Sequence, residues 1–300
     1  KTHPEWFALI DGKRDFNISC ETLGNLCLSQ KGLLDAFIAD ARAYFDANPE
    51  IKIYSVMPND WFNRICDCDD CQKQADYSKP ESGKYSNYVW NFVNKVAREV
   101  GKTHPDHFIA CCAYNTYQAI PDKVKLEPNV AVMFTKARYY RFDDAYRIRN
   151  DILAYQWSHQ TKNFFIWEYY CWDSTNSHLS GIPILFSKWI EKDLRNLKGV
   201  TAGEFIDGGA NPRFNYKFIH PELNSLNYYL TASLYWDTSL NVNELLEDYY
   251  NSFFGPAAPE MKKYWTRAEE LWTNMDVKKR GASDHITGTL YTPKVLLELK

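Results

Sequence analysis

Four carboxylates stand at or directly after short apolar runs, where they could do acid–base chemistry. They are Asp60, Glu168, Glu204 and Asp207. Cleaving a glycosidic bond requires a proton donor for the leaving oxygen and a group that stabilises the positive charge on the sugar, usually two carboxyls a few ångströms apart. A helix N-cap or a surface ion pair explains Glu204 and Asp207 as well as catalysis does. Asp60 is the strongest candidate because it follows Asn59 at the end of an apolar run, although an Asx turn would look the same.

Aromatic and amide side chains accompany these carboxylates. They are Trp61, Tyr114, Asn115, Trp167, Tyr169 and Trp172. Aromatic faces stack on sugar rings and a few polar groups fix a ligand's orientation, so we expect these residues, together with Glu204 and Asp207, to bind a sugar substrate. The alternative is a large core that simply uses many aromatic side chains, which make up 16% of the chain.

Three of the eight cysteines lie in one short segment. Cys66, Cys68 and Cys71 are close enough in sequence to share a metal ion, but tetrahedral zinc needs a fourth ligand that the spacing does not reveal. A local disulfide is the alternative. In either case the role is structural, because the cluster would pin the segment that follows Asp60. No cofactor is expected for catalysis.

The order of the predicted elements places the candidate residues at one edge of a parallel sheet. Strand-like runs alternate with helical patterns, which is typical of parallel strands joined by crossover helices. The expected strands cover residues 51–57, 107–114, 129–135, 163–170 and 199–205, and the expected helices before and between them cover residues 32–48, 85–104, 143–160 and 183–197. Ligands of such sheets bind beyond the carboxyl ends of the strands, where the candidate residues lie.

The element order predicts the α/β class, with a (β/α) TIM-type barrel in residues 1–215 and a C-terminal helical extension in residues 216–300. In the extension three helical patterns, over residues 221–236, 242–254 and 258–274, follow one another without a strand. A closed barrel has eight strands, whereas only five are clear, with residues 6–10 and 26–28 as weaker candidates. Either the first barrel strands precede Lys1, or the chain forms an open or incomplete sheet.

Composition and charge exclude several classes of function. The formal net charge is -3, so the chain lacks the basic field that a nucleic acid partner requires. No apolar run approaches the roughly 20 residues that span a bilayer. The chain begins without Met or a signal peptide, so we expect an export signal that has been removed or a longer parent sequence. An enzyme of phosphorylated metabolites should have a glycine-rich phosphate loop, of which residues 207–210 (DGGA) are a faint version.

Seven segments together resemble one bacterial family. They are residues 3–9 (HPEWFAL), 12–14 (GKR), 26–29 (LCLS), 55–60 (SVMPND), 66–71 (CDCDDC), 166–170 (IWEYY) and 250–258 (YNSFFGPAA). This family of originally unknown function is common in gut Bacteroidetes, and its barrel is related to those of α-glucuronidases and family 20-type hexosaminidases. Some members are endo-β-N-acetylglucosaminidases that cut the chitobiose core of complex N-glycans.

The resemblance implies a secreted, periplasmic or cell-surface glycoside hydrolase whose partner is an oligosaccharide or a glycoprotein glycan. In hexosaminidase-like barrels an acidic or amide residue precedes the acid at a strand end, and the substrate acetamide attacks the anomeric carbon with retention. Asn59 and Asp60 resemble that pair, so Asn59 would orient the acetamide while Asp60 protonates the leaving oxygen. Glu168 is the second candidate for acid or nucleophile. The alternatives are a glucuronidase-like exo-glycosidase and a non-catalytic carbohydrate-binding barrel.

Overall fold

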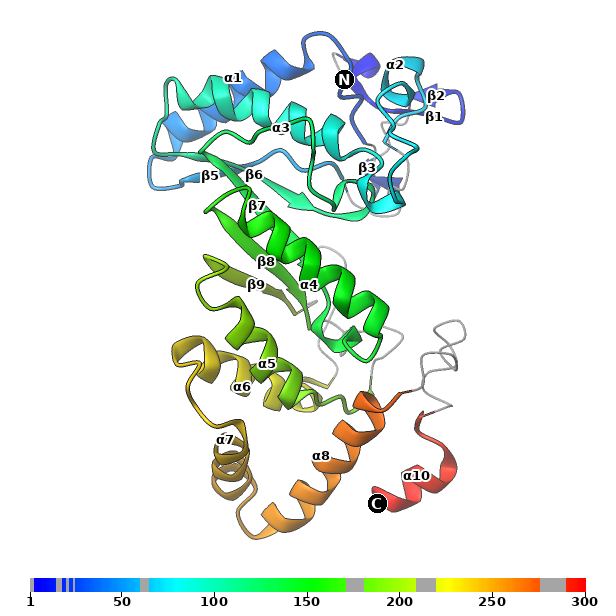
Figure 1. Ribbon diagram of the computed structural model, residues 1–300, viewed down its shortest axis with the longest axis vertical. Helices are drawn as coiled ribbons and strands as arrows, with labels where there is room; N and C mark the ends of the chain where they lie inside the picture. The colour runs from blue at the N-terminus through cyan, green and yellow to red at the C-terminus, as the bar shows by residue number, and fades with distance from the viewer. Residues whose placement is uncertain are drawn as a thin grey trace. The chain divides into compact units, whose positions relative to one another are not determined.

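The computed structural model describes residues 3–14, 18–19, 22–23, 25–59, 65–170, 181–208, 220–275 and 290–300. Its central feature is a parallel sheet of five strands in sequential order (Figure 1). The strands are β5 (Ile53–Ser55), β6 (Phe108–Ala113), β7 (Val130–Lys136), β8 (Phe164–Tyr169) and β9 (Gly203–Asp207). Each overlaps one of the five runs expected from the sequence, so the α/β class and the strand order are confirmed.

The sheet is open, however, so the prediction of a (β/α) TIM-type barrel is wrong. In the described part of the chain β5 and β9 are the two edge strands and do not pair with each other. A closed barrel needs eight strands, and the two weaker candidates do not supply more. Leu9–Ile10 form β1 of a separate hairpin, and Leu26 makes an isolated antiparallel bridge with Phe7. Local antiparallel pairing thus occupies the runs that the barrel prediction needed.

The β1 hairpin follows from its two turn residues. β1 pairs antiparallel with β2 (Lys13–Arg14), with Leu9 opposite Arg14. Asp11 and Gly12 have φ values of 49° and 77°. Two-residue hairpin loops need this left-handed pair, and an Asp-Gly sequence is among those that adopt it most readily. A second hairpin pairs β3 (Ile18–Ser19) with β4 (Thr22–Leu23).

The helices near the first strands bury one apolar face each. In α3 (Ser86–Gly101) the buried Val89, Val93 and Val96 recur at four- and three-residue spacing, which places them on one side of the helix. Burying each such side chain stabilises the fold by about 1.5–3 kcal/mol. α3 packs on β6 and on α1 (Leu33–Ala47), so this face covers the sheet.

Two compact units divide the chain. The first comprises Lys1–Thr135, Ile152–Trp167 and Thr201–Glu204. The second comprises Lys136–Asp151, Glu168–Val200 and Phe205–Lys300. Helix α4 (Asp144–Ser158) contributes residues to both. The boundary expected between residues 215 and 216 lies outside the described residues.

The second unit is mainly helical. Its longer elements are α5 (Ser187–Leu197), α6 (Ser225–Trp236), α7 (Val242–Tyr249), the π-helix η7 (Tyr250–Phe254), α8 (Ala258–Thr273) and α10 (Pro293–Glu298). α6 packs on α5 and α7, and α8 packs on η7 with Trp265 and Trp272 buried. The three helical patterns expected after residue 216 are therefore confirmed.

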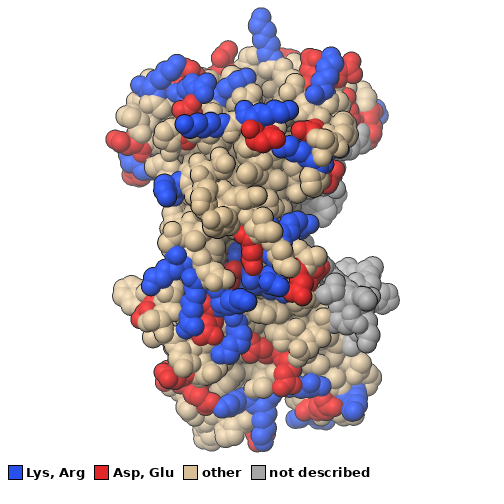
Figure 2. Space-filling view, in the orientation of Figure 1, with Lys and Arg blue, Asp and Glu red and all other residues tan. Residues whose placement is uncertain are grey.

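Short helical turns occupy several connections. They are η1 (Pro4–Trp6), α2 (Asp69–Gln72), η2 (Glu81–Gly83), η3 (Asn115–Tyr117), η4 (Arg138–Tyr140), η6 (Pro221–Leu223) and η8 (Gly255–Ala257). None of the helices in the described ranges combines the length and apolar character that crossing a bilayer requires. On the face seen in Figure 2, basic and acidic side chains are interspersed, as expected for a net charge of -3.

Candidate functional site

Asn59 follows strand β5 at the carboxyl edge of the sheet. Val56 and Pro58 are buried after the strand, and Asn59 is exposed. The backbone N–H of Asn59 donates to Oδ1 of the buried Asn25 at 3.3 Å, so a side chain from a separate segment fixes the chain direction here. Asp60 and Trp61, which come next in the sequence, lie outside the described residues, as does Trp172.

Tyr114 and Asn115 follow β6, the neighbour of β5 in the sheet. Asn115 has a φ of 51°, a left-handed conformation that asparagine adopts more readily than most residues. Both side chains are half-buried. Because β5 and β6 are parallel and adjacent, their carboxyl ends lie at the same edge. The structure therefore brings Asn59, Tyr114 and Asn115 to one edge of the first unit.

The end of β8 separates the predicted residues onto two faces of the strand. Successive side chains of a strand point to opposite faces. Glu168 is buried, as Phe164 and Ile166 are, whereas Trp167 and Tyr169 are half-buried. Trp167 and Tyr169 thus share a face from which Glu168 points away.

Glu168 is held by several donors. Its Oε1 accepts hydrogen bonds from the backbone N–H groups of Arg138 at 2.6 Å and Tyr169 at 3.0 Å. The guanidinium of Arg138 lies 3.9 Å from Oε2, and both side chains have 0% exposure. A carboxylate with these surroundings cannot touch a sugar in this conformation, and the contacts suit it to fixing the end of β8.

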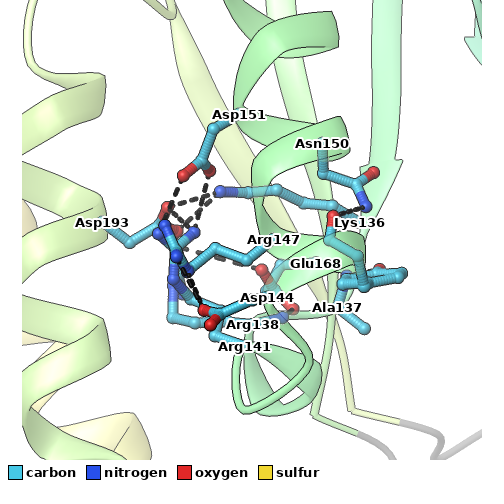
Figure 3. Close-up of polar contacts among 11 residues, drawn as sticks. Lys136, Ala137, Arg138, Arg141, Asp144, Arg147, Asn150, Asp151, Glu168 and Asp193 are labelled. Atoms are coloured by element: carbon cyan, nitrogen blue, oxygen red, sulfur yellow. Dashed lines mark hydrogen bonds and ion pairs between the residues drawn. The ribbon is translucent and has the colours of Figure 1, made fainter.

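Arg138 also belongs to a buried charge cluster centred on Asp193 of α5 (Figure 3). Asp193 accepts hydrogen bonds from Lys136 Nζ at 2.6 and 2.7 Å, from Arg138 Nε at 2.7 Å and from Arg141 Nη1 at 3.0 Å. Burial by itself raises the pKa of Asp193, but the three cations outweigh it and hold that pKa well below its ordinary value. The chain's own side chains therefore neutralise this carboxylate.

The sequence reasoning missed the Asp193 cluster. Lys136 and Arg138 directly follow an apolar run, which is the position that singled out Asp60 and Glu168. The prediction considered only carboxylates, amides and aromatic rings as site residues, so it did not include these two cations. Their partner Asp193 sits in a helical pattern, where nothing local distinguishes it from a solvated charge.

Glu204 and Asp207 both lie in β9 and are half-buried. The backbone N–H of Tyr170 donates to the carbonyl oxygen of Asp207 at 2.8 Å, which joins the ends of β8 and β9. These positions do not test the substrate-binding role expected for the two carboxylates, which stays a prediction. In the segment of residues 207–210, residues 209 and 210 lie outside the described residues.

A fourth cysteine joins the three that the sequence singled out. The Sγ atom of Cys27 lies 3.6 Å from that of Cys68 and 3.6 Å from that of Cys71. With Cys66, all four sulfur atoms lie within 4.8 Å of one another, and none is in a disulfide. Spacing rules could not identify Cys27, because it comes from a distant segment; the only signal was its place in residues 26–29, one of the segments that carry the family resemblance.

Hydrogen-bond donors surround the cysteine cluster. The backbone N–H of Leu9 donates to Cys66 Sγ at 3.2 Å, and a guanidinium nitrogen of Arg14 lies 4.0 Å from the same sulfur. Hydrogen bonds from Cys66 and Cys71 hold the pKa of the Cys27 thiol far below its ordinary value, while the bond with Cys27 raises the pKa of Cys66 to about 11.

Comparison with known proteins identifies the family. Residues 1–266 match the family described as Domain of unknown function (DUF4838), and the chain belongs to it. No curated protein and no solved structure matches the chain.

Proposed function

We propose that this member of the DUF4838 family is a glycoside hydrolase that binds its glycan at the carboxyl edge of the sheet in the first unit. The observation that carries the proposal is the position of Asn59 beside the strand end that bears Tyr114 and Asn115. An exposed amide, an aromatic ring and a second amide are the groups that orient and stack a sugar. Ligands of parallel α/β sheets bind at this edge.

The proposed reaction is retaining cleavage beside an N-acetylglucosamine unit, assisted by the substrate acetamide. Asp60 follows Asn59 directly in the sequence, as the proposed pair of residues requires. The acetamide, oriented by a hydrogen bond with Asn59, attacks the anomeric carbon through its oxygen while the glycosidic bond breaks and the leaving oxygen takes the proton of Asp60. Water then attacks the anomeric carbon as the bond from that carbon to the acetamide oxygen breaks, and the attacking water returns a proton to Asp60.

Glu168 has a positioning role in this proposal. Its carboxylate is buried against Arg138, and its contacts orient the end of β8. Trp167, which belongs to the first unit and lies on the other face of that strand, is then the aromatic residue available to a sugar ring. Glycoprotein glycans outside the cytoplasm are the proposed substrates, in particular the chitobiose core of complex N-glycans.

A panel of glycans tests the proposal. The purified chain is incubated with N-glycosylated peptides, free chitobiose-containing glycans and plant glucuronoxylan, and the products are resolved by mass spectrometry. We expect a peptide that retains a single N-acetylglucosamine. Release of glucuronic acid alone would replace the proposal with a glucuronidase-like exo-glycosidase, and binding without cleavage would replace it with a carbohydrate-binding protein. A chain that neither binds nor cleaves any glycan of the panel would refute the proposal.

A further inference from the structure

We infer that Cys27, Cys66, Cys68 and Cys71 bind one zinc ion, which has a structural role in the first unit. Cys27 supplies the ligand that the Cys66–Cys71 segment lacks. The inference concerns a site separate from the proposed sugar site, so it does not depend on the glycosidase proposal.

The sulfur positions match a shared central ion. Zinc bonded to four thiolates at about 2.3 Å in tetrahedral geometry places the sulfur atoms about 3.8 Å apart. Cys27 Sγ lies 3.6 Å from two of its partners, and all four sulfur atoms lie within 4.8 Å of one another. A disulfide would bring two sulfur atoms to about 2.05 Å, and these cysteines are free. The geometry therefore favours a four-ligand site over a pair of disulfides.

The surroundings of the sulfur atoms suit thiolates. The N–H of Leu9 donates to Cys66, and the hydroxyl of Tyr88 lies 3.0 Å from Cys71 Sγ. The guanidinium of Arg14 near Cys66 adds a positive charge. Four thiolates with one divalent ion leave two negative charges, which such donors stabilise, and contacts of this kind orient the ligands of metal sites.

The ligand set identifies the class of ion and its role. Four sulfur ligands in tetrahedral geometry select zinc or iron over magnesium and calcium, which prefer oxygen. A site closed by four protein ligands has no open position for a substrate, so it is structural and not catalytic. Cys27, Cys66 and Cys71 are fully buried, as a structural site requires, and Cys68 is partly exposed.

The ion would join two segments that lie far apart in the sequence. Cys68 precedes the short helix α2, and the N–H groups of Cys71 and Gln72 both donate to its carbonyl oxygen at 3.0 Å. The N–H of Cys27 donates to the carbonyl oxygen of Trp6 at 2.8 Å. An ion bound here therefore holds residues 66–72 against the segment of Cys27.

The same ion would affect the candidate sugar site through Asn25. Asn25 lies two residues before Cys27, and its side chain accepts the N–H of Asn59 at 3.3 Å. Its carbonyl oxygen accepts the N–H of Ala8 at 2.8 Å. Fixing Cys27 thus also fixes the group that sets the direction of the chain at Asn59. Loss of the ion should loosen this segment as well as the cysteine loop.

Metal analysis of the native chain tests the inference. The native chain, purified without chelators and dialysed, should retain one equivalent of zinc by inductively coupled plasma mass spectrometry. Cys27→Ser should lose it. Cys111→Ala, which removes a buried thiol of β6 outside the cluster, is the matched control and should keep it. Replacing zinc with cobalt should give the intense near-ultraviolet and visible bands of tetrahedral thiolate coordination.

Three results would overturn the inference. The native chain could retain no zinc, the Cys27→Ser variant could retain as much zinc as the native chain, or the native chain could contain stoichiometric iron in place of zinc. If Cys27→Ser does not fold, Cys27→His keeps a donor at that position and should bind cobalt with an altered spectrum; an unaltered spectrum would exclude Cys27 as a ligand. Since none of these measurements uses a glycan, a failed glycosidase assay leaves them unchanged.

Discussion

Polar side chains at the carboxyl ends of the strands differ in burial and pairing between the two halves of the sheet. At β5 and β6, Asn59 is exposed, and Tyr114 and Asn115 are half-buried. At β7 and β8, Lys136 and Glu168 are buried and paired with other charges of the chain. All these residues lie within or just after the last residues of a strand. Burial and partners therefore distinguish a residue that can reach a substrate from one that stabilises the fold.

This difference has an energetic consequence. Breaking a buried charge cluster by removing one partner leaves the others uncompensated and is costly, whereas an exposed side chain can change with little effect on stability. Changes at the β5 end should therefore alter activity alone, and changes in the Asp193 cluster should alter stability. Each of the following predictions tests one side of that comparison.

The largest effect should come from Asp60→Asn, on activity. The amide keeps the shape of the side chain but cannot donate the proton, so hydrolysis of the natural glycan should fall by roughly 10²–10⁴-fold. An activated aryl glycoside, whose leaving group needs little protonation, should be affected less. Steady-state rates on both substrates, with the melting temperature of the variant, provide the measurement.

Asp106→Asn is the matched control for Asp60→Asn. Asp106 is an exposed carboxylate just before β6, at the opposite edge of the sheet from the candidate site. Its replacement should leave both rates unchanged. Near-normal turnover of the natural glycan by Asp60→Asn would contradict the assignment, and Asp207 would then be the next candidate for the acid.

Asp193→Asn should have the next largest effect, on stability. Removing this charge leaves Lys136, Arg138 and Arg141 facing one another in a buried cluster, at an expected cost of about 3–5 kcal/mol in the free energy of unfolding. Denaturant titration measures it. Asp151→Asn also removes a carboxylate that pairs with Arg141, but its side chain is 38% exposed and should cost no more than about 1 kcal/mol. Equal costs for the two variants would show that the cluster is not neutralised mainly by Asp193.

Trp167→Ala should have the smallest effect, on binding. If its half-buried ring is a sugar platform, oligosaccharide binding should weaken by about 1–3 kcal/mol in titration calorimetry, while the fold remains intact. Phe165→Ala removes a half-buried ring from the same face of β8, further from the strand end, and should leave binding unchanged. The contrary result is a melting temperature of Trp167→Ala that falls by several degrees, with binding lost only through unfolding. That result would show that the ring belongs to the core.

The regular elements were predictable because their signals are local. The α3 valines repeat at helical spacing, and β6 and β8 coincide with short runs of mostly apolar and aromatic residues, so the order of strands and helices follows from neighbouring residues. The candidate residues after β5 and β6 were predictable for the same reason, since parallel strands place their carboxyl ends at one edge. Whether residues 6–10 pair with a barrel strand or with β2 depends on contacts between segments, and there the prediction failed.

The sequence by itself determined the α/β class, the order of the five strands, the three late helices and the cysteine triplet, because each depends on the spacing of residues within a short window. Only the tertiary structure decided that the sheet is open, that Cys27 completes the cysteine cluster, and that Glu168 turns toward Arg138. These features join segments far apart in the chain. Which distant groups meet depends on how whole elements pack, and no local pattern records that.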